Sequence, residues 1–268
     1  MTHRSLGLGL ALLVSTGLGL AAAAPPASAT AAPTAIAAPA GAPTAVPFAG
    51  TPRVGALFTG GSGGRLGRHF CTATVVDSPG HDLLVTAAHC VVVPGSGRVT
   101  TGLVFVPGYH DGLSPYGQWT VTRVTADAKW SVHGDPDYDV AFLTVAPQAK
   151  GLKLEDAAGS EALGFDTGRG AAAVAVGYPD RTERPVHCGS AALRGFGADQ
   201  LEFDCAGLPG GTSGGPLLTG TTAGAGGRGT VVGVIGGHQD GGRTSAVSYS
   251  PYFGPGIAAV YRAAIRQG

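Results

Sequence analysis

The stretch GLPGGTSGGP at residues 207–216 places Ser213 among glycines, and it is the most informative segment of this chain. Two earlier stretches complement it: LLVTAAHC at 83–90, which contains His89, and DYDVAFL at 137–143, which contains Asp139. A serine hydroxyl becomes a good nucleophile when a neighbouring base removes its proton. An imidazole does this near neutral pH, and a carboxylate holds its tautomer and stabilises the imidazolium. The three residue types together predict nucleophilic catalysis.

The glycines beside Ser213 allow a tight turn whose backbone N–H groups point to one place. There they can stabilise the oxyanion of a tetrahedral intermediate, and we expect Gly211 and Ser213 to be the donors. Each stretch also has a plain structural interpretation: a histidine beside a cysteine, an aspartate at a strand entry and a glycine-rich loop. Their presence together in one chain favours the catalytic interpretation.

The remainder of the chain from Val54 onward consists of short apolar runs broken by Gly, Pro, Asp and Ser. Many short strands with turn residues between them predict an all-β barrel or sandwich. The C-terminal stretch differs, because apolar residues recur there at three- and four-residue spacing and predict an amphipathic helix at about 257–267. The expected strands are 54–58, 70–76, 83–88, 103–107, 119–126, 139–145, 171–178, 201–205, 215–219, 230–236 and 244–249.

The front of the chain has a different composition, with no charged residue between Arg4 and Arg53. A basic start, an apolar stretch and the small-residue site Ala27-Ser28-Ala29 predict a secretory signal peptide at 1–29. An uncleaved membrane anchor is the alternative, but the apolar run is weakly hydrophobic. Residues 30–52 are rich in Ala, Pro and Thr and are interpreted as a linker or a removed pro-segment.

The charge and the cysteines narrow the function further. The chain has 17 basic and 17 acidic residues, which argues against nucleic acid or an anionic membrane as a partner. In an exported protein the four cysteines (Cys71, Cys90, Cys188 and Cys205) favour two disulfides, with three pairings open. Because there is no C-x2-C pair, we expect no metal site.

The motifs TAAHC, D-V-A-F-L and G-x-S-G-G-P occur here in that order, and in this they resemble the chymotrypsin-like (trypsin-like, PA-clan) serine peptidases, particularly secreted bacterial members. The resemblance covers about residues 52–268. It implies two six-stranded antiparallel β-barrels, at about 53–150 and 171–255, followed by a C-terminal α-helix. It also implies an active site in the cleft between the barrels.

The resemblance also implies roles for individual residues. His89 is then the general base, Asp139 its orienting carboxylate and Ser213 the nucleophile of a serine endopeptidase that forms an acyl-enzyme. Cys71–Cys90 and Cys188–Cys205 are the implied disulfides, and no cofactor is needed. The expected protein is a secreted monomer that acts on proteins or peptides without a stable membrane association.

Two positions depart from the family. Thr212 stands where most animal members have an aspartate that pairs with a new N-terminus, although Arg53-Val54 resembles a cleavage junction. Gly207 stands where enzymes that cut after Lys or Arg have an aspartate, so this preference is not expected. A small or apolar side chain at the cleavage site is favoured instead. The expected substrate-binding residues are Gly207, Ile235, Gly236, Gly237 and His238, with the two glycines offering backbone to a substrate strand.

Two alternatives remain to be considered. G-x-S-x-G also marks the nucleophile of α/β-hydrolases, but those enzymes place the acid and the histidine after the serine and need alternating helices. The other alternative is a catalytically weak or inactive peptide-binding module on the same fold. Retention of His89, Asp139 and Ser213 favours an enzyme over this module.

Overall fold

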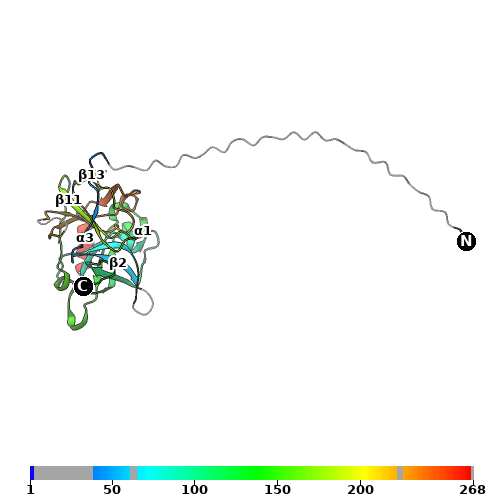
Figure 1. The fold of residues 1–268 in the computed structure, drawn as a ribbon, viewed down its shortest axis with the longest axis horizontal. Helices are drawn as coiled ribbons and strands as arrows, with labels where there is room; N and C mark the ends of the chain where they lie inside the picture. Colours follow the sequence, from blue (N-terminus) through cyan, green and yellow to red (C-terminus); the bar gives the residue numbers. More distant parts are fainter. Residues whose placement is uncertain (3–38, 61–64, 222–225, 267–268) are drawn as a thin grey trace. The chain divides into compact units, whose positions relative to one another are not determined.

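The computed structural model describes residues 1–2, 39–60, 65–221 and 226–266 (Figure 1). Residues 3–29 of the expected signal peptide and residues 30–38 of the expected linker lie outside the described residues. The first half of the fold is a closed six-stranded barrel, so this part of the prediction is confirmed. Its strands, in spatial order, are β2 (Val54–Gly60), β3 (Leu66–Val75), β4 (Leu83–Thr86), β9 (Ala141–Val145), β8 (Trp119–Ala126) and β7 (Leu103–Pro107).

The burial of these strands explains their sequence pattern. All five residues of β9 are buried, and four of them (Ala141, Phe142, Leu143 and Val145) are apolar, which suits a strand that is covered on both sides. β8 begins at the fully buried Trp119 and has exposed residues in its middle. The barrel interior is packed with large side chains, among them Phe105, Trp119 and Leu143. Burial of this apolar area stabilises the barrel.

The second half of the fold agrees with the expected all-β class, but its described strands do not form a closed barrel, so the second six-stranded barrel stays a prediction. It contains two sheets that share a core. Between β17 and β18 the side chain of Ser250 intervenes: the Val234 N–H donates to Ser250 Oγ at 2.9 Å in place of a backbone carbonyl. The six-stranded sheet has the order β1 (Val46–Pro47), β12 (Val186–Ala192), β11 (Ala172–Gly177), β15 (Pro216–Thr219), β17 (Thr230–Val234) and β10 (Ala162–Leu163). The three-stranded sheet has the order β13 (Arg194–Phe196), β14 (Gln200–Asp204) and β18 (Val247–Pro251).

Strand β1 lies within the segment that the composition assigns to the linker. It pairs with β12, Val46 lying opposite His187 and Pro47 opposite Val186. Backbone hydrogen bonds extend this connection on both sides, from Ala45 N to Ala206 O and from Phe48 N to Pro185 O. The folded part therefore begins about ten residues earlier than the expected boundary at 53, because an edge strand needs backbone partners rather than apolar periodicity.

The C-terminal helix is confirmed as α3 (Pro255–Ile265), drawn in red in Figure 1. Proline at its start is favourable because its missing N–H has no partner in the first helical turn. Ile257, Val260 and Ala264 are buried in the core, and α3 packs against β8 and β9 of the first barrel. The expected apolar face is therefore the face that packs.

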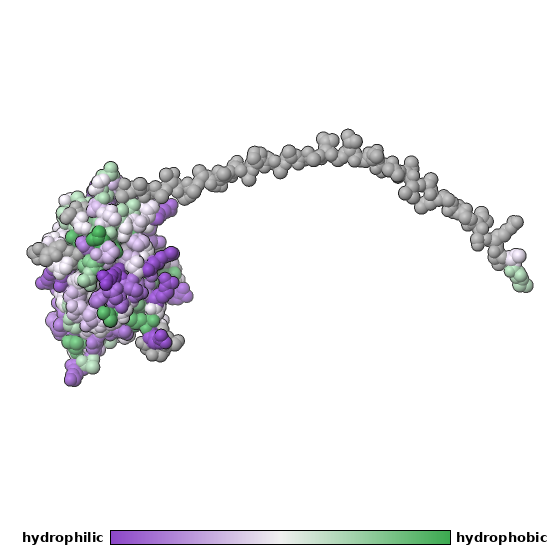
Figure 2. Space-filling model, in the orientation of Figure 1, coloured by the Kyte–Doolittle hydropathy of each residue, from purple (hydrophilic) through white to green (hydrophobic). Residues whose placement is uncertain are grey.

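The shorter elements were not expected from the sequence. They are the helices α1 (Ala128–His133) and α2 (Leu154–Ala158), the 3-10 turns η2 (Ala88–Cys90), η3 (Pro136–Tyr138), η4 (Ala149–Gly151) and η5 (His238–Gly241), and the two-stranded sheet of β5 (Val92–Val93) and β6 (Arg98–Val99). Within the described part of the chain, no helix has the length and apolarity needed to cross a bilayer. On the face shown in Figure 2, apolar patches are scattered among polar ones.

Candidate active site

His89 is held from two directions in the short turn η2, directly after barrel strand β4. The neighbouring Cys90 forms a disulfide with Cys71 of β3. From the other side, the carboxylate of Asp139 accepts a bond from the His89 backbone N–H and another from the ring Nδ1, both at 2.7 Å. With Nδ1 donating to Asp139, the ring presents Nε2 as an acceptor.

Asp139 is fully buried between η3 and β9, and its carboxylate accepts three N–H bonds. The third comes from the backbone of Gly237, which donates to Oδ2 at 2.7 Å. A buried charge needs such partners. Asp135 and Asp137 lie nearby in sequence but have other partners. Asp135 caps η3, and the Asp137 carboxylate accepts a hydrogen bond from Gln200. Of these three aspartates, Asp139 is therefore the one hydrogen-bonded to His89.

Burial of the His89 ring disfavours the imidazolium and lowers the pKa. The charge of Asp139, the hydrogen bond to it and the charge of Asp240 act in the opposite direction. Together they outweigh burial, so the pKa of His89 is raised above 6.5. The ring is 17% exposed, which leaves it accessible at the surface of the site.

The Ser213 turn is anchored to the first barrel by Thr72 of β3. The Thr72 N–H donates to Ser213 O at 2.8 Å, and the Thr72 hydroxyl donates to Gly211 O at 2.9 Å. At Gly214, an added Cβ would lie 2.1 Å from Thr86 Oγ1 and 3.0 Å from the Ala87 nitrogen. This close approach brings the turn against the end of β4, just before His89. Among the described residues, the Ser213 hydroxyl makes no hydrogen bond to His89.

The backbone around Ser213 divides into bonded and unbonded N–H groups. Thr212, Gly214 and Gly215 donate to Pro209 O, Ile235 O and Thr212 O. Within the described residues, Gly211 and Ser213 have no such acceptor. Gly211 adopts φ +92°, and a Cβ there would lie 2.3 Å from the Asp180 nitrogen. Only glycine fits this conformation and this space.

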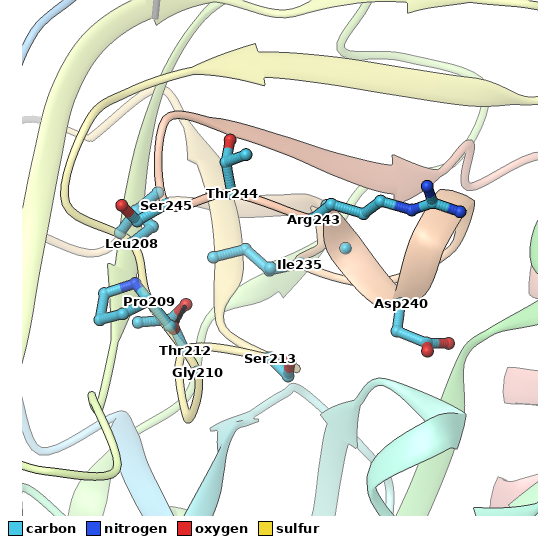
Figure 3. A pocket seen from close by; sticks show the side chains of 12 residues that line it. Leu208, Pro209, Gly210, Thr212, Ser213, Ile235, Asp240, Arg243, Thr244 and Ser245 are labelled. Carbon is cyan, nitrogen blue, oxygen red and sulfur yellow. Dashed lines mark hydrogen bonds between the residues drawn. The ribbon is translucent and has the colours of Figure 1, made fainter. Parts of the chain in front are cut away.

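A cavity of about 250 Å³ opens beside Ser213 (Figure 3). Leu208 and Ile235 provide apolar surface in it, and Asp240 and Arg243 provide charge. In Figure 3 the guanidinium of Arg243 points away from Leu208 and Pro209. The complete lining is Leu208, Pro209, Gly210, Thr212, Ser213, Ile235, Asp240, Gly241, Gly242, Arg243, Thr244 and Ser245.

Of the five expected substrate-binding residues, Ile235 lines this cavity. Gly207 lies behind its wall, where an added Cβ would contact Ala45 at 3.4 Å. Gly236 and Gly237 use their N–H groups on Tyr249 O and Asp139, so these donors are already engaged. The His238 ring packs against Phe196 and Tyr249 at centroid distances of 4.9 and 4.8 Å, and it does not line the cavity.

Sequence reasoning missed the segment 240–245, which supplies half of the cavity lining. Its sequence, DGGRTS, is typical of a turn, and its position a few residues after Gly237 is the single signal available. Whether this turn lies beside Ser213 depends on how the chain runs between β17 and β18. The local sequence of 240–245 does not show this.

Two groups of side chains near His89 have metal-ligand spacing in the described residues: Cys71, His89 and Cys90, and His89, Asp139 and Asp240. The cysteines of the first group form a disulfide and have no thiolate to offer. In the second group, Nδ1 of His89 and Oδ2 of Asp139 already bond to each other. A second disulfide, Cys188–Cys205, joins β12 to the residue that follows β14.

Comparison with known proteins agrees with this geometry. The model of a family described as the trypsin-like peptidase domain matches residues 71–234. Among solved structures, the protease Anisep from Arthrobacter nicotinovorans is similar, with a TM-score of 0.69 and 28% identity over 82% of this chain and 98% of its own. The thermostable serine protease AL20 from an extremophilic microorganism has a TM-score of 0.68 and 27% identity over 81% of this chain and 99% of its own.

A third structure, of a Glu endopeptidase, shares the fold at 16% identity, with a TM-score of 0.64 over 85% of this chain and 99% of its own. No curated protein sequence matches the chain. The family match covers more than half of the chain, and the first two protease structures match over nearly the whole of their own chains. The chain belongs to the family of the trypsin-like peptidase domain, with a chymotrypsin-like fold, and is a serine endopeptidase.

Proposed function

We propose that this endopeptidase is secreted and cleaves peptide bonds with Ser213 as nucleophile, His89 as general base and Asp139 as the carboxylate that orients His89. The 2.7 Å bond from His89 Nδ1 to the buried Asp139 is the observation that carries the proposal. It fixes the tautomer in which Nε2 can accept a proton. The close packing of the Ser213 turn on the strand that precedes His89 supports the pairing of base and nucleophile.

The reaction then follows from these positions. Ser213 Oγ attacks the carbonyl carbon of the peptide bond while its proton moves to His89 Nε2. The N–H groups of Gly211 and Ser213 stabilise the oxyanion, and their lack of protein acceptors within the described residues supports this role. His89 returns the proton to the leaving amine, which leaves an acyl-enzyme on Ser213. Water then attacks the acyl carbonyl while its proton moves to His89 Nε2, and the proton passes to Ser213 Oγ as the carboxylic acid product is released.

The cavity beside Ser213 supports a preference for a small or apolar side chain at the cleavage site. Leu208 and Ile235 form apolar surface in a space of about 250 Å³. Its acid, Asp240, is exposed, so it cannot serve as the buried partner that a Lys or Arg side chain needs. His238, expected among the substrate-binding residues, packs among aromatic rings instead of lining the cavity, so the proposal gives it no contact with the substrate side chain.

Activity without cleavage at Arg53–Val54 is part of the proposal. Val54 is fully buried in β2, and the Arg53 Nε donates to the buried Glu161 at 2.8 Å. The Arg53–Val54 peptide bond is therefore part of the folded structure. Thr212 is not available as an ion-pair partner for a new N-terminus, and its hydroxyl donates to Pro209 O at 2.7 Å. Two disulfides support an oxidising compartment.

The test compares the secreted chain with Ser213→Ala on a denatured protein mixture, with cleavage sites identified by mass spectrometry. We expect cleavage after small or apolar residues by the unmodified chain and none by the variant. Equal cleavage by both would reject the triad. Binding of peptides by both without cleavage would instead support the peptide-binding module. The N-terminus and the sedimentation of the secreted protein test secretion, processing and the monomeric state.

A further inference from the structure

The turn after Gly237 contains an acidic residue that the reaction described above does not use. A carboxylate oxygen of Asp240, a ring nitrogen of His89 and a carboxylate oxygen of Asp139 all lie within 4.8 Å of one another. Asp139 is buried and fully engaged with N–H donors, whereas Asp240 is exposed. His89 is therefore approached by two carboxylates, one from the side of β9 and one from η5.

The backbone that presents Asp240 is strained. Gln239 and Asp240 both adopt φ +56°, a left-handed conformation that side chains with a Cβ disfavour. Aspartate and asparagine tolerate it better than most residues, but two consecutive cases need support from their surroundings. Here that support is visible: the Gly237 N–H is bonded to Asp139, the His238 N–H to Gln200, and the Asp240 N–H to Gly237 O.

We propose that Asp240 is a positioning residue whose charge stabilises the imidazolium of His89. This inference rests on the proposed function, because it assigns His89 the role of general base. The Gly237 N–H that donates to Asp139 lies at the start of the turn that presents Asp240. The backbone of Gly237 therefore links the positions of the two aspartates.

The other groups around His89 do not supply this charge. Ser213 is neutral, and the disulfide Cys71–Cys90 does not titrate. Arg243 lines the same cavity as Asp240, but among the described residues no ion pair joins the two. Both carboxylates act in the same direction, since each raises the pKa of His89.

The first experiment measures the pH dependence of kcat/KM for the secreted chain and for Asp240→Asn, with EDTA present to exclude bound metal. Asparagine keeps the tolerance for the left-handed backbone and removes only the charge. We expect the acid limb to move down by about 0.5 pH unit, the size appropriate to an exposed charge about 5 Å away. We also expect the plateau to fall about threefold, because the same charge stabilises the imidazolium that forms during the reaction.

The matched control is Asp166→Asn. Asp166 is also exposed and left-handed, at φ +55°, but it lies beside Gly254 and does not act on the pKa of His89. Its profile should equal that of the unmodified chain. Sodium chloride at 1 M should remove most of the difference between Asp240→Asn and the unmodified chain, since the screening length is then about 3 Å.

A second measurement does not depend on activity. NMR titration of the His89 imidazole in Ser213→Ala, with and without Asp240→Asn, should show a lower pKa without the Asp240 charge. An unchanged pKa would overturn the inference, as would altered substrate selection with an unmoved acid limb. A lowered His89 pKa without a matching shift of the acid limb would support the interaction of Asp240 with His89 but reject His89 as the general base. This outcome distinguishes a failure of the proposed function from a failure of the inference.

Discussion

At the scale of single residues, Asp139 is the point where the candidate site is assembled. Its buried carboxylate accepts N–H bonds from the backbone and ring of His89 and from Gly237. Two of these donors come from η2 in the first half of the fold and one from the segment after β17 in the second half. A change at any donor therefore moves the carboxylate relative to His89.

Gly236 offers a direct test of this arrangement. A Cβ at this position would lie 3.0 Å from Asp139 Oδ2 and 3.1 Å from the Ala87 Cβ, which is closer than ordinary contact. We expect Gly236→Ala to displace the carboxylate by a few tenths of an ångström and to lower kcat about tenfold, a cost of about 1.4 kcal/mol. Steady-state kinetics measures it.

Gly189→Ala in β12 is the matched control, because a Cβ there meets nothing within 4 Å. It should leave kcat within twofold of the unmodified value, as the open space predicts. Wild-type kcat in Gly236→Ala would show that the site absorbs the added methyl group, and would contradict the tight coupling of Gly236 to Asp139.

The pH dependence of activity follows from the raised pKa of His89. A general base must be neutral, and the neutral fraction grows as pH rises through the folded-state pKa. We therefore expect the midpoint of the acid limb of kcat/KM above 6.5. The stabilisation from imidazolium–carboxylate pairing has the opposite sense: it is complete below the unfolded-state pKa and is lost as pH rises through the folded value. An acid-limb midpoint below 6.5 would contradict the direction of the shift.

At the scale of elements, the short strand β1 and the residues before it support the cavity wall. Ala45 N donates to Ala206 O, and Ala206 N donates to Pro43 O. The adjoining Gly207 and the lining residue Leu208 both donate to Ser245 O, at 2.7 and 3.1 Å. The N-terminal segment therefore holds the back of the substrate cavity, although its composition resembles that of a linker.

Removal of this segment should weaken both the fold and substrate binding. A chain that begins at residue 49 loses the three backbone bonds of Ala45, Ala206 and Phe48 described above, together with the β1 pairing. At about 1 kcal/mol for each bond, the three named bonds alone predict a loss of about 3 kcal/mol in unfolding free energy, and loss of the β1 pairing adds to it. KM should rise, because the 206–208 wall is released.

Denaturant unfolding and kinetics of chains that begin at residues 40 and 49 measure this effect. The longer chain retains the pairing and serves as the control. Equal stability and equal KM in the two chains would mean that β1 is dispensable, and residues 30–52 would then be free to act as a removable segment.

At the scale of the whole molecule, the two halves meet at Thr72. Its hydroxyl donates to Gly211 O and accepts from the Tyr178 N–H at 2.8 Å, and its N–H donates to Ser213 O. A single buried threonine of the first barrel thus fixes the turn of the second half that carries Ser213. The relative placement of His89 and Ser213 depends on this junction.

Thr72→Val should remove the hydrogen bonds of the Thr72 hydroxyl while keeping the side-chain volume nearly unchanged. Two buried groups lose their partner, so we expect a loss of about 2–4 kcal/mol in unfolding free energy. The oxyanion turn also loses its support, and kcat should fall at least tenfold. Thr74→Val is the control on the same strand, because Thr74 is equally buried and its Oγ1 has no hydrogen-bond partner among the described residues.

Denaturant unfolding and kinetics of both variants give the comparison. Thr74→Val should match the unmodified chain or exceed its stability, since an unsatisfied hydroxyl is replaced by a methyl group. A similar loss in both variants would assign the effect to the loss of a threonine in β3 in general. It would then not support a specific junction at Thr72.

The strands with continuous or alternating apolar runs were predictable from local sequence, and β7 and β8 agree with their expected bounds. The short elements β1, β10 and β13 were not predictable. Two- and three-residue strands exist because a partner strand offers hydrogen bonds at that place, and their own side chains carry no period. The hydrogen bond from the Val234 N–H of β17 to Ser250 Oγ of β18 likewise joins residues whose pairing no local pattern predicts.

By itself the sequence determined the all-β class, the C-terminal helix and the choice of His89, Asp139 and Ser213 as candidates, because periodicity and motif chemistry are local properties. Tertiary structure alone decided that Gly237 donates to Asp139, that β1 pairs with β12 and that Asp240 lies close to His89. Each of these contacts joins segments that lie far apart in the chain. Their distances are set by how the barrel and the two sheets pack, which no short stretch of residues specifies.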